Sequence, residues 1–398
     1  MTARTPESTK ERKNKRTKER KTEVPLGLYV HIPFCVRKCH YCDFTSGPLS
    51  AKARQMYLEA LQEEIRSTSW RGCPATTVFL GGGTPSELTI SELKELVTAI
   101  TQAFKIEEDA EWSIECNPGT TSKDYFAAVG EMGFNRVSLG VQSFEDSHLR
   151  TLGRIHNAEE ARAAYHQLRR TGFDNLNLDL MFALPGQTLA GWRADLEEAL
   201  GLSPEHLSLY NLTIEPGTEF GNRLVNGELK ETDEDLAADM YELAMDLTRA
   251  AGYQQYEISN YCLPGRECVH HLIYWHNQPY LGFGISASSF MEGTRWTHTT
   301  SLTEYIRTAS SGLVTRACQE KLNDREALGE EIMLGLRTEE GISTAALSSR
   351  YSFDVASLFS QTFQSLGHNG LLLQEGEQVR LTRRGKMMAN DVCAQFLV

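Results

Sequence analysis

The stretch Tyr29-Val-His-Ile-Pro-Phe-Cys35-Val-Arg-Lys-Cys39-His-Tyr41-Cys42-Asp-Phe44 carries three cysteines at the spacing C-x3-C-x2-C. Thiolates at this spacing can converge on one side of a tight loop and hold three corners of a cubane [4Fe–4S] cluster. A cluster used only for electron transfer normally has four cysteine ligands, so three leave one iron open to a small molecule. S-adenosylmethionine (SAM) can chelate such an iron, and its cleavage would supply a radical that no side chain provides. The sequence therefore predicts a SAM-ligated cluster at Cys35, Cys39 and Cys42.

Two other kinds of site also use closely spaced cysteines. Zinc takes four ligands, usually as two C-x2-C pairs or with histidines, and no second pair lies near these three cysteines. A dithiol redox pair is the other alternative. The preceding HIPFC and the aromatic Tyr41 make the pattern longer than three cysteines, which favours the cluster.

The composition of the 398-residue chain is that of a folded protein, with 40% hydrophobic and 23% charged residues. The length allows two or three domains, or one barrel with an appendage. We find no apolar run of transmembrane length. Nine cysteines, an odd number, are scattered along the chain, which argues for free thiols in a reducing compartment. We therefore expect a cytoplasmic protein that is not a transmembrane protein.

Residues 1–24 differ from the rest of the chain in charge. They hold nine Lys or Arg and four Asp or Glu, a net charge of +5, whereas the whole chain carries −13. Almost nothing apolar occurs there, so we expect a disordered basic tail, with an anion- or RNA-binding arm as the alternative. The remaining residues are acidic, and we expect no nucleic-acid partner.

Short apolar runs alternate with amphipathic stretches as far as about residue 212. We expect helices near 50–68, 90–104, 122–132, 158–171, 189–201 and 233–251. The expected strands are Gly27–Ile32, Thr76–Leu80, Trp112–Ile114, Arg136–Leu139, Asn175–Leu180 and His206–Tyr210. Six such units predict an α/β fold with a parallel sheet, a partial (β/α)6 barrel.

Each predicted strand ends in a polar or glycine-rich signature. The second is followed by Gly81-Gly82-Gly83-Thr84-Pro85, the third ends at Glu115, and the fourth and fifth end near Gln142 and Asp179. Because the C-terminal strand ends of (β/α) barrels build the site, these residues are candidates to bind ribose hydroxyls or an ammonium group. Arg154 is a candidate partner for a carboxylate, with a surface arginine as the alternative.

The segment Cys262–Tyr280 concentrates possible metal or haem ligands. It reads Cys268-Val-His270-His271-Leu-Ile-Tyr274-Trp275-His276-Asn277 at its centre. Cysteine, histidine and tyrosine can each ligate a metal or a haem iron. The structural alternative is a strand with a polar face and with Leu272, Ile273 and Trp275 buried.

After about residue 300 the pattern changes to mainly helical stretches followed by a hairpin. We expect helices near 302–310, 324–337, 343–350 and 354–366, and a hairpin over 371–382. Helices with a hairpin predict a mostly helical, winged-helix-like domain. Its basic residues are few, so we interpret it as a cover or a partner-binding domain rather than a DNA reader.

The motifs HIPFCxxxCxYCDF, GGGTP, ECNPG, RVSLGVQSF, LGRIH and YNLTIEPGT, with the C-terminal module, resemble the oxygen-independent coproporphyrinogen oxidase group of radical SAM proteins. Within that group the chain most resembles the HemW-type haem chaperones. The resemblance covers about residue 25 to the end. It implies the [4Fe–4S] ligands Cys35, Cys39 and Cys42, and SAM contacts at Tyr29, Tyr41, Gly82, Gly83, Thr84, Glu115, Gln142, Arg154 and Asp179. It also implies a radical SAM core over 25–290 and a HemN-like C-terminal domain over 300–398.

Two features of the sequence favour a chaperone over an oxidase. The oxidase has a further cysteine two places after the third ligand, where this chain has Phe44, and a longer N-terminal arm, where this chain has only the polar tail. The resemblance therefore implies a protein that binds haem and transfers it to an acceptor protein, with a flavodoxin or ferredoxin as electron donor. The alternatives are a coproporphyrinogen III dehydrogenase and a radical SAM enzyme with another substrate.

The sequence also departs from the chaperone pattern. The family motif Cys-x-His-Asn-x-x-Tyr-Trp has His271 in place of asparagine, and a family histidine further on is Ser288. We expect haem contacts at His270 and Tyr274 first, because they occupy the motif positions, with His276 as the alternative.

Overall fold

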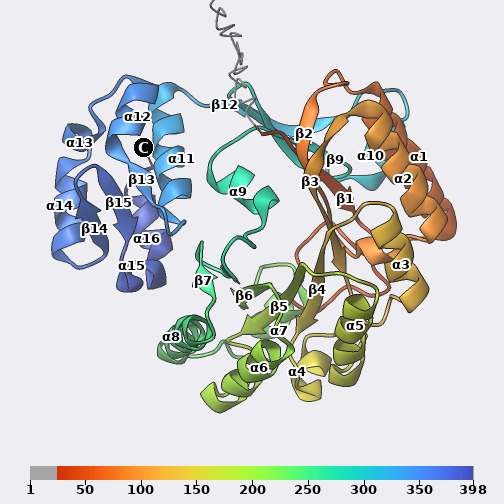
Figure 1. Ribbon diagram of the computed structural model, residues 1–398, viewed down its shortest axis with the longest axis horizontal. Helices are drawn as coiled ribbons and strands as arrows, with labels where there is room; N and C mark the ends of the chain where they lie inside the picture. The colour runs from red at the N-terminus through yellow and green to blue at the C-terminus, as the bar shows by residue number, and fades with distance from the viewer. Residues whose placement is uncertain (1–24, 398) are drawn as a thin grey trace, which may run out of the picture.

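The computed structural model describes residues 25–397, and the predicted basic tail over residues 1–24 lies outside them. Two lobes make up this part of the chain (Figure 1). The larger contains a curved sheet of twelve strands with helices on its outer face, and the smaller is a mainly helical domain with three short strands. Within residues 25–397, no helix combines the length and the apolar character that crossing a membrane requires.

Six parallel strands form the middle of the large sheet, as the sequence predicts. They are β1 (Gly27–Ile32), β2 (Pro74–Gly82), β3 (Lys105–Cys116), β4 (Arg136–Gln142), β5 (Leu176–Phe182) and β6 (His206–Asn211). Along β1, Leu28 and Val30 belong to the same apolar core as Leu61 and Ile65 of the covering helix. The alternate positions Tyr29 and His31 point to the concave side, because successive side chains of a strand face opposite ways.

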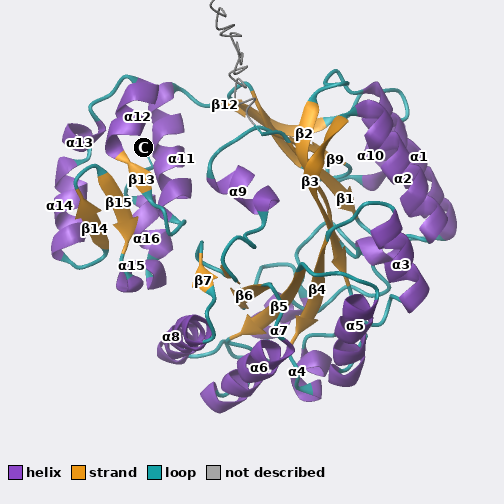
Figure 2. Ribbon diagram, viewed as in Figure 1, coloured by secondary structure: helices purple, strands orange, loops and turns teal. Residues whose placement is uncertain are grey.

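Helices connect these strands and cover the convex face (Figure 2). The longer ones are α1 (Ala51–Ser67), α2 (Ile90–Ala103), α3 (Lys123–Glu131), α5 (Ala158–Arg170), α6 (Leu189–Leu202) and α8 (Glu234–Ala250). Shorter ones are η1 (Pro85–Glu87), α4 (Asp146–Thr151) and α7 (Glu219–Val225). Side-chain caps fix several starts: the Thr89 hydroxyl accepts from the Glu92 amide, and the Glu92 carboxylate accepts in return from the Thr89 amide.

The sheet continues beyond the six parallel strands on both sides, so the barrel stays open. On one side β8 (Asn260–Cys262) and β7 (Gln254–Gln255) add antiparallel to β6. On the other side β9 (Tyr280–Phe283) pairs parallel with β1, followed by antiparallel β10 (Ser288–Met291), β11 (Thr294–His298) and β12 (Arg316–Lys321). The helix α10 (Leu302–Ala309) packs on α1. Residues 300–321, which the sequence assigned to the C-terminal domain, thus lie with the barrel.

The C-terminal domain has its own apolar core, drawn from residues 328–396. Its helices are α11 (Asp324–Leu336), α12 (Thr344–Tyr351), α13 (Val355–Leu358), α14 (Ser360–His368), α15 (Arg383–Met387) and α16 (Ala389–Ala394). Its strands β13 (Ile342–Ser343), β14 (Leu372–Glu375) and β15 (Gln378–Leu381) form one antiparallel sheet. Helices with a hairpin confirm the predicted winged-helix-like architecture.

Candidate functional site

The three cysteines lie in the loop that joins β1 to α1, and all three line one cavity of about 390 Å3. The Thr84 hydroxyl lies 3.5 Å from the Cys35 sulfur, and the Arg154 guanidinium donates to the Cys39 sulfur at 3.3 Å. Burial raises the pKa of Cys35 and of Cys42, so both thiols favour the neutral form until a bound cation compensates their charge. These contacts orient the sulfurs toward the cavity.

The spacing of the possible ligands bears on the zinc alternative. Among residues 25–397, no three His, Cys, Asp or Glu side chains converge closely enough to hold one metal ion. Zinc needs such convergence, whereas the cysteines of a cubane cluster each bind a different iron and stand farther apart. The arrangement fits a cluster better than a single ion.

The residues predicted for SAM surround the same cavity. Eleven of the twelve predicted cluster and SAM residues line it: Cys35, Cys39, Tyr41, Cys42, Gly82, Gly83, Thr84, Glu115, Gln142, Arg154 and Asp179. The twelfth, Tyr29, lines a neighbouring cavity. The C-terminal ends of the parallel strands meet at this edge of the sheet, which brings together residues more than a hundred positions apart.

The glycines after β2 let the chain pass close to the cysteine loop. Gly82 has φ +110°, which favours glycine, and a Cβ there would lie 2.5 Å from the His31 ring. A Cβ at Gly83 would lie 2.7 Å from the carbonyl oxygen of Phe34. Any larger residue at these two positions would push the loop away from the cavity.

Two half-buried carboxylates face the cavity from neighbouring parts of the sheet. Glu115 accepts a hydrogen bond from the Gly82 amide at 3.0 Å, and Asp179 accepts from the Ser138 hydroxyl at 2.9 Å. Burial, and then the charge of Asp179, raise the pKa of Glu115 to about 7. Burial also raises the pKa of Asp179. A ligand that brings an ammonium group or hydroxyls to these carboxylates would restore the stabilisation that burial removes.

Arg154 lines the cavity, so it is not an outward-pointing surface arginine. Its guanidinium donates to Asn117 Oδ1 at 2.6 Å and to the Gly140 carbonyl at 2.7 Å, while its Nε has no partner among the described residues. His156 Nδ1 also lies 3.1 Å from Asn117 Oδ1. Asn117 lies in the quoted ECNPG motif, but no role was predicted for this residue from the sequence.

Gln142 ends β4 in a left-handed conformation. Its φ is +70°, and the pairing with β5 shifts by one residue between Gly140 and Gln142. Such a backbone is costly for a residue with a side chain and is found at functional sites. The bulge turns the Gln142 side chain into the cavity.

A second cavity of about 470 Å3 adjoins the first on the concave side of the barrel. Both cavities are lined by Phe44, Gly82 and Glu115, so only these side chains and backbone stand between them. Tyr29 and Tyr274 line the second cavity, as does Ser288, the position of the missing family histidine. A ligand there would lie beside the predicted SAM site.

The histidine-rich segment is helical at its centre, and the strand considered as an alternative is wrong. Residues Val269–Trp275 form the short helix α9, in which Ile273 is buried while Leu272 and Trp275 are only partly buried. A tertiary contact explains the difference. Glu111, on the concave side of β3, accepts from the amides of Val269 at 3.0 Å and His270 at 3.1 Å. Nothing in the local sequence predicts this cap.

The structure separates the three predicted haem residues. His270 is buried, and its ring nitrogens lie 2.7 Å from the Thr77 hydroxyl and 2.7 Å from the Tyr274 hydroxyl. Both nitrogens are therefore engaged. Tyr274 faces the second cavity, whereas His276 follows α9 and lies 3.4 Å from Glu340 of the C-terminal domain.

Comparisons with known proteins agree with this geometry. The model of the radical SAM superfamily matches residues 29–199, and that of the HemN C-terminal domain matches residues 322–388. The "Heme chaperone HemW" of Bacillus subtilis (strain 168) is 38% identical over 93% of this chain and 98% of its own length. The "Heme chaperone HemW" of Lactococcus lactis is 34% identical over 94% of this chain and 98% of its own length.

A solved structure matches over nearly the whole chain. It is described as "Coproporphyrinogen III oxidase (HemN) from Escherichia coli is a Radical SAM enzyme" and superimposes with a TM-score of 0.83. It is 25% identical and covers 94% of this chain and 90% of its own. The match extends through both lobes.

Proposed function

The chain belongs to the radical SAM superfamily and, within it, to the family of the HemW haem chaperones, and on this premise we propose that it binds haem and delivers it to an acceptor protein. The observation that carries the proposal is the match to named haem chaperones over more than nine tenths of both chains. The same relatives favour a chaperone over an oxidase.

We further propose that Cys35, Cys39 and Cys42 hold a [4Fe–4S] cluster and that SAM occupies the rest of the first cavity. When bound, the cluster supplies a one-electron reductant beside the SAM sulfonium. The chain's own part is to bind and orient. Glu115 and Asp179 offer acceptors to an ammonium group or to ribose hydroxyls, and Arg154 offers a donor to a carboxylate.

An electron donor needs a place to dock near the cluster loop. Arg37, Lys38 and the exposed Val36 lie in this loop, and both basic residues line the first cavity. An acidic protein such as a flavodoxin or ferredoxin would be attracted to these charges. We propose this loop as the entry point for electrons.

Coproporphyrinogen III dehydrogenase is the second candidate, because the fold of the HemN oxidase matches this chain with a TM-score of 0.83. The second cavity, beside the SAM site, is where a porphyrinogen would meet the cofactor. A dehydrogenase must turn its substrate over, whereas a chaperone only holds haem. The two functions therefore differ in a measurable way.

Titration of the anaerobically reconstituted full-length protein with haem tests the proposal. We expect a saturable Soret change at about one haem per chain, retained through gel filtration. Transfer of that haem to an added apoprotein should leave the chain intact and able to bind again. Failure to retain any haem would contradict the proposed function.

A further inference from the structure

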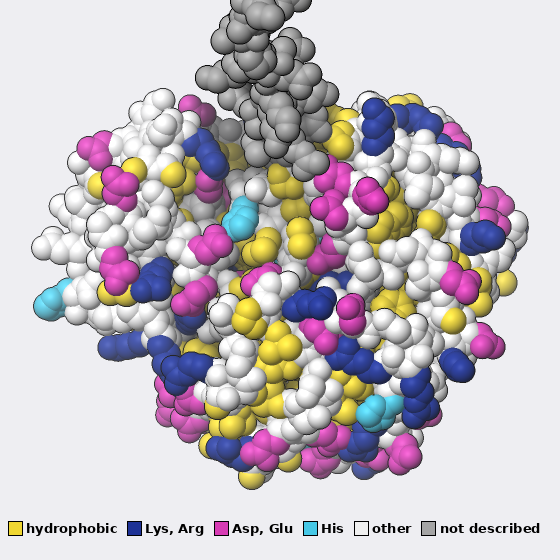
Figure 3. Space-filling view, viewed as in Figure 1, with side chains coloured by type: hydrophobic (Ala, Val, Ile, Leu, Met, Phe, Trp, Pro, Cys, Tyr) yellow, Lys and Arg dark blue, Asp and Glu magenta, His cyan; other side chains and the backbone are white. Residues whose placement is uncertain are grey.

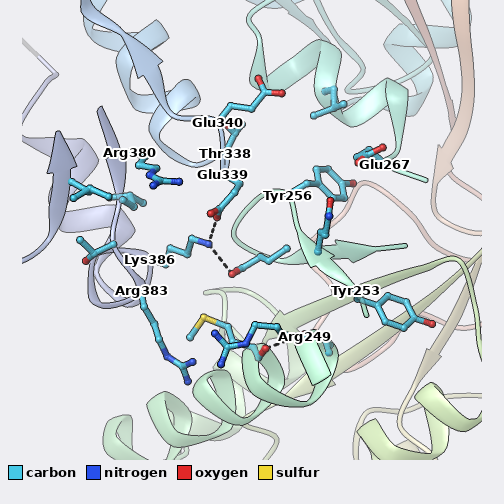
Figure 4. Close-up of a pocket in the computed structure, with 18 residues that line it drawn as sticks. Arg249, Tyr253, Tyr256, Glu267, Thr338, Glu339, Glu340, Arg380, Arg383 and Lys386 are labelled. Atoms are coloured by element: carbon cyan, nitrogen blue, oxygen red, sulfur yellow. Dashed lines mark hydrogen bonds and ion pairs between the residues drawn. The ribbon is translucent and has the colours of Figure 1, made fainter. Parts of the chain in front are cut away.

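A third cavity, of about 1000 Å3, lies between the barrel and the C-terminal domain. Side chains of both lobes line it, with Arg249 and Arg383 toward one end and Glu340 toward the other (Figure 4). Basic and acidic side chains also lie beside each other on the surface along this seam (Figure 3). Because opposite charges are mixed in its lining, this cavity does not select one class of ligand.

The second cavity differs from the third in that one of its walls is a turn with an unfavourable backbone. Ser286 and Ser288 line this cavity and belong to residues 284–288, which lead from β9 into β10 and are called the 284–288 turn below. Gly284 has φ +102° and Ser286 has φ +53°. A left-handed backbone is costly for serine, so other contacts must hold the turn in this shape.

The helix α1 holds the 284–288 turn from behind. Glu64 Oε2 accepts from the Gly284 amide at 3.0 Å, and the Tyr57 hydroxyl accepts from the Ile285 amide at 3.3 Å. The Tyr57 hydroxyl donates in turn to the His31 carbonyl at 2.7 Å. A Cβ at Gly284 would lie 2.5 Å from the Tyr57 hydroxyl oxygen, so the turn and the helix are in close contact.

Glu64 is a buried carboxylate surrounded by neutral donors. The Tyr305 hydroxyl of α10 donates to its Oε2 at 2.6 Å, and His298 Nδ1 of β11 lies 3.4 Å from its Oε1. The same His298 nitrogen lies 3.0 Å from the Gly284 carbonyl oxygen. Among the described residues, neither a Lys nor an Arg pairs with Glu64. The nearby charge of Arg316 on β12 disfavours protonation of His298, so this ring does not supply a positive charge either.

The protonation state of Glu64 therefore affects the turn. Burial raises the pKa of Glu64 to about 7, and burial lowers that of His298 to about 4. Both side chains are neutral between these values, and above pH 7 Glu64 carries a charge that no cation compensates. Opening of the turn would admit water to the carboxylate and lower the cost of this charge, so ionisation of Glu64 favours the open turn.

From this arrangement we infer that Glu64 is a positioning residue for the second cavity, a latch that holds the 284–288 turn while protonated and releases it when ionised. The turn fixes where Ser286 and Ser288 lie, and with them one wall of the cavity. A haem that contacts Tyr274 lies in this cavity, so its retention depends on the latch. This consequence for haem rests on the proposed function, whereas the latch itself is a property of the ligand-free chain.

Hydrogen exchange of the ligand-free, full-length chain tests the latch. Exchange rates of segments within residues 280–290 are measured between pH 5.5 and pH 8.5 and corrected for the intrinsic rate at each pH. The corrected rate of the wild type should rise about tenfold or more over this range, because each unit of pKa difference changes the opening equilibrium about tenfold. A flat corrected rate in the wild type overturns the inference.

Two matched variants of α1 identify the group responsible. Glu64→Gln keeps an oxygen that accepts from the Gly284 amide but cannot ionise, so its corrected rate should stay flat. Glu59→Gln, exposed on the same helix, should follow the wild type. An equal rise with pH in Glu64→Gln and the wild type would show that another group titrates.

Tyr305→Phe distinguishes a latch from a merely structural contact. The variant removes a hydrogen bond that stabilises the charged form of Glu64, so the midpoint of the rise should move to higher pH. A structural role alone would change the rate equally at every pH. An unchanged midpoint therefore speaks against Glu64 as the titrating group.

Haem retention through gel filtration at pH 6 and at pH 8.5 connects the latch with the proposed function. The wild type should retain less haem at pH 8.5 than at pH 6, whereas Glu64→Gln should retain equal amounts. Equal losses in the two proteins would overturn the role of the latch in haem retention. A wild type that binds no haem at either pH contradicts the proposed function but leaves the exchange result in place, so the two failures are distinguishable.

Discussion

At the scale of single residues, the first cavity gathers acidic groups whose charged forms are destabilised by burial. Glu115 and Asp179 are half-buried carboxylates, and the charge of Asp179 adds to the burial that raises the pKa of Glu115. Cys35 and Cys42 are half-buried thiols, and burial raises the pKa of both. Removing such groups from water costs free energy that a bound cofactor returns. The cavity is thus built for ligands that carry positive charge.

Glu115→Gln should stabilise the cofactor-free chain at neutral pH and weaken SAM binding. The pKa of Glu115 is about 7 in the folded chain and ordinarily 4.5, so the folded state binds the extra proton between these values. Its stability therefore falls as pH rises from about 4.5 to 7, by at most about 3 kcal/mol. The glutamine oxygen still accepts from the Gly82 amide but carries no charge.

Urea unfolding at pH 4.5 and pH 8 measures this effect. We expect the free energy of unfolding of the variant to exceed that of the wild type only at pH 8. Equal destabilisation of the variant at both pH values would show that the charge of Glu115 does not destabilise the folded chain.

Changing Cys35, Cys39 and Cys42 together to alanine should abolish the cluster. Anaerobic reconstitution of the wild type should give about four irons per chain, and the variant should retain almost none. Iron and sulfide analysis makes the measurement. Cys73→Ala, outside the cavity, is the matched control and should keep the wild-type iron content. A cluster retained in the triple variant would refute the ligand assignment.

At the scale of elements, the short helix α9 depends on a carboxylate from the sheet. Its seven residues are too few to be stable alone, and no side chain at its own N-cap contributes a hydrogen bond. Glu111 fills that role from β3, and the buried Arg136 on β4 is attracted to its charge. The position of both faces of α9 follows from this contact.

Glu111→Ala should therefore destabilise the chain and disturb haem binding. It leaves two backbone amides without their acceptor, at a cost of about 1–3 kcal/mol in the free energy of unfolding. Chemical denaturation and haem titration measure the two effects. Glu107→Ala, exposed on the same strand, should change neither stability nor haem affinity. Glu111→Gln should give values between those of the wild type and of Glu111→Ala. Wild-type haem affinity in Glu111→Ala would show that α9 does not need the cap.

The sequence predicts those elements that depend on residues close together in the chain, and it misses those that depend on contacts between distant residues. Hydrophobic periodicity is local, and it predicts β1 to β6 and most of the helices. The strand alternative for the histidine-rich segment failed because α9 is held by Glu111, more than 150 positions away. The pairing of β9 with β1 and the extension through β12 likewise join distant segments, which no local pattern reveals.

The same distinction holds for the site. The cysteine spacing, the strand-end motifs and the family resemblance together predicted eleven residues that line one cavity. Those at strand ends meet there because parallel strands bring their C-terminal ends together. The motif could not tell which histidine is accessible. His270 occupies the family position but has both nitrogens engaged, and this follows from packing against Thr77 and Tyr274.

At the scale of the whole molecule, ion pairs join the C-terminal domain to the barrel. Arg295 of β11 forms a two-pronged ion pair with Glu330 of α11, and Arg383 of α15 pairs with Asp246 of α8. The large cavity lies along this boundary. Polar interfaces of this kind allow domains to move relative to each other.

Arg295→Gln should loosen the C-terminal domain. It leaves the half-buried Glu330 without its charged partner, and the docking should weaken by about 1–3 kcal/mol. Hydrogen exchange of α11 should accelerate, while that of β3 and β4 should stay unchanged. Arg307→Gln, exposed on α10, serves as the control. Unchanged exchange in α11 would show that this pair does not hold the lobes together.

Turnover of coproporphyrinogen III is the most direct test of the central claim, that this barrel serves a haem chaperone. The reconstituted full-length protein is incubated anaerobically with a reductant, SAM and coproporphyrinogen III, and porphyrins are quantified over time. We expect no protoporphyrinogen beyond one equivalent of protein, together with stoichiometric haem binding by the same preparation. Continued formation of protoporphyrinogen over many turnovers would contradict it and identify the chain as an oxidase.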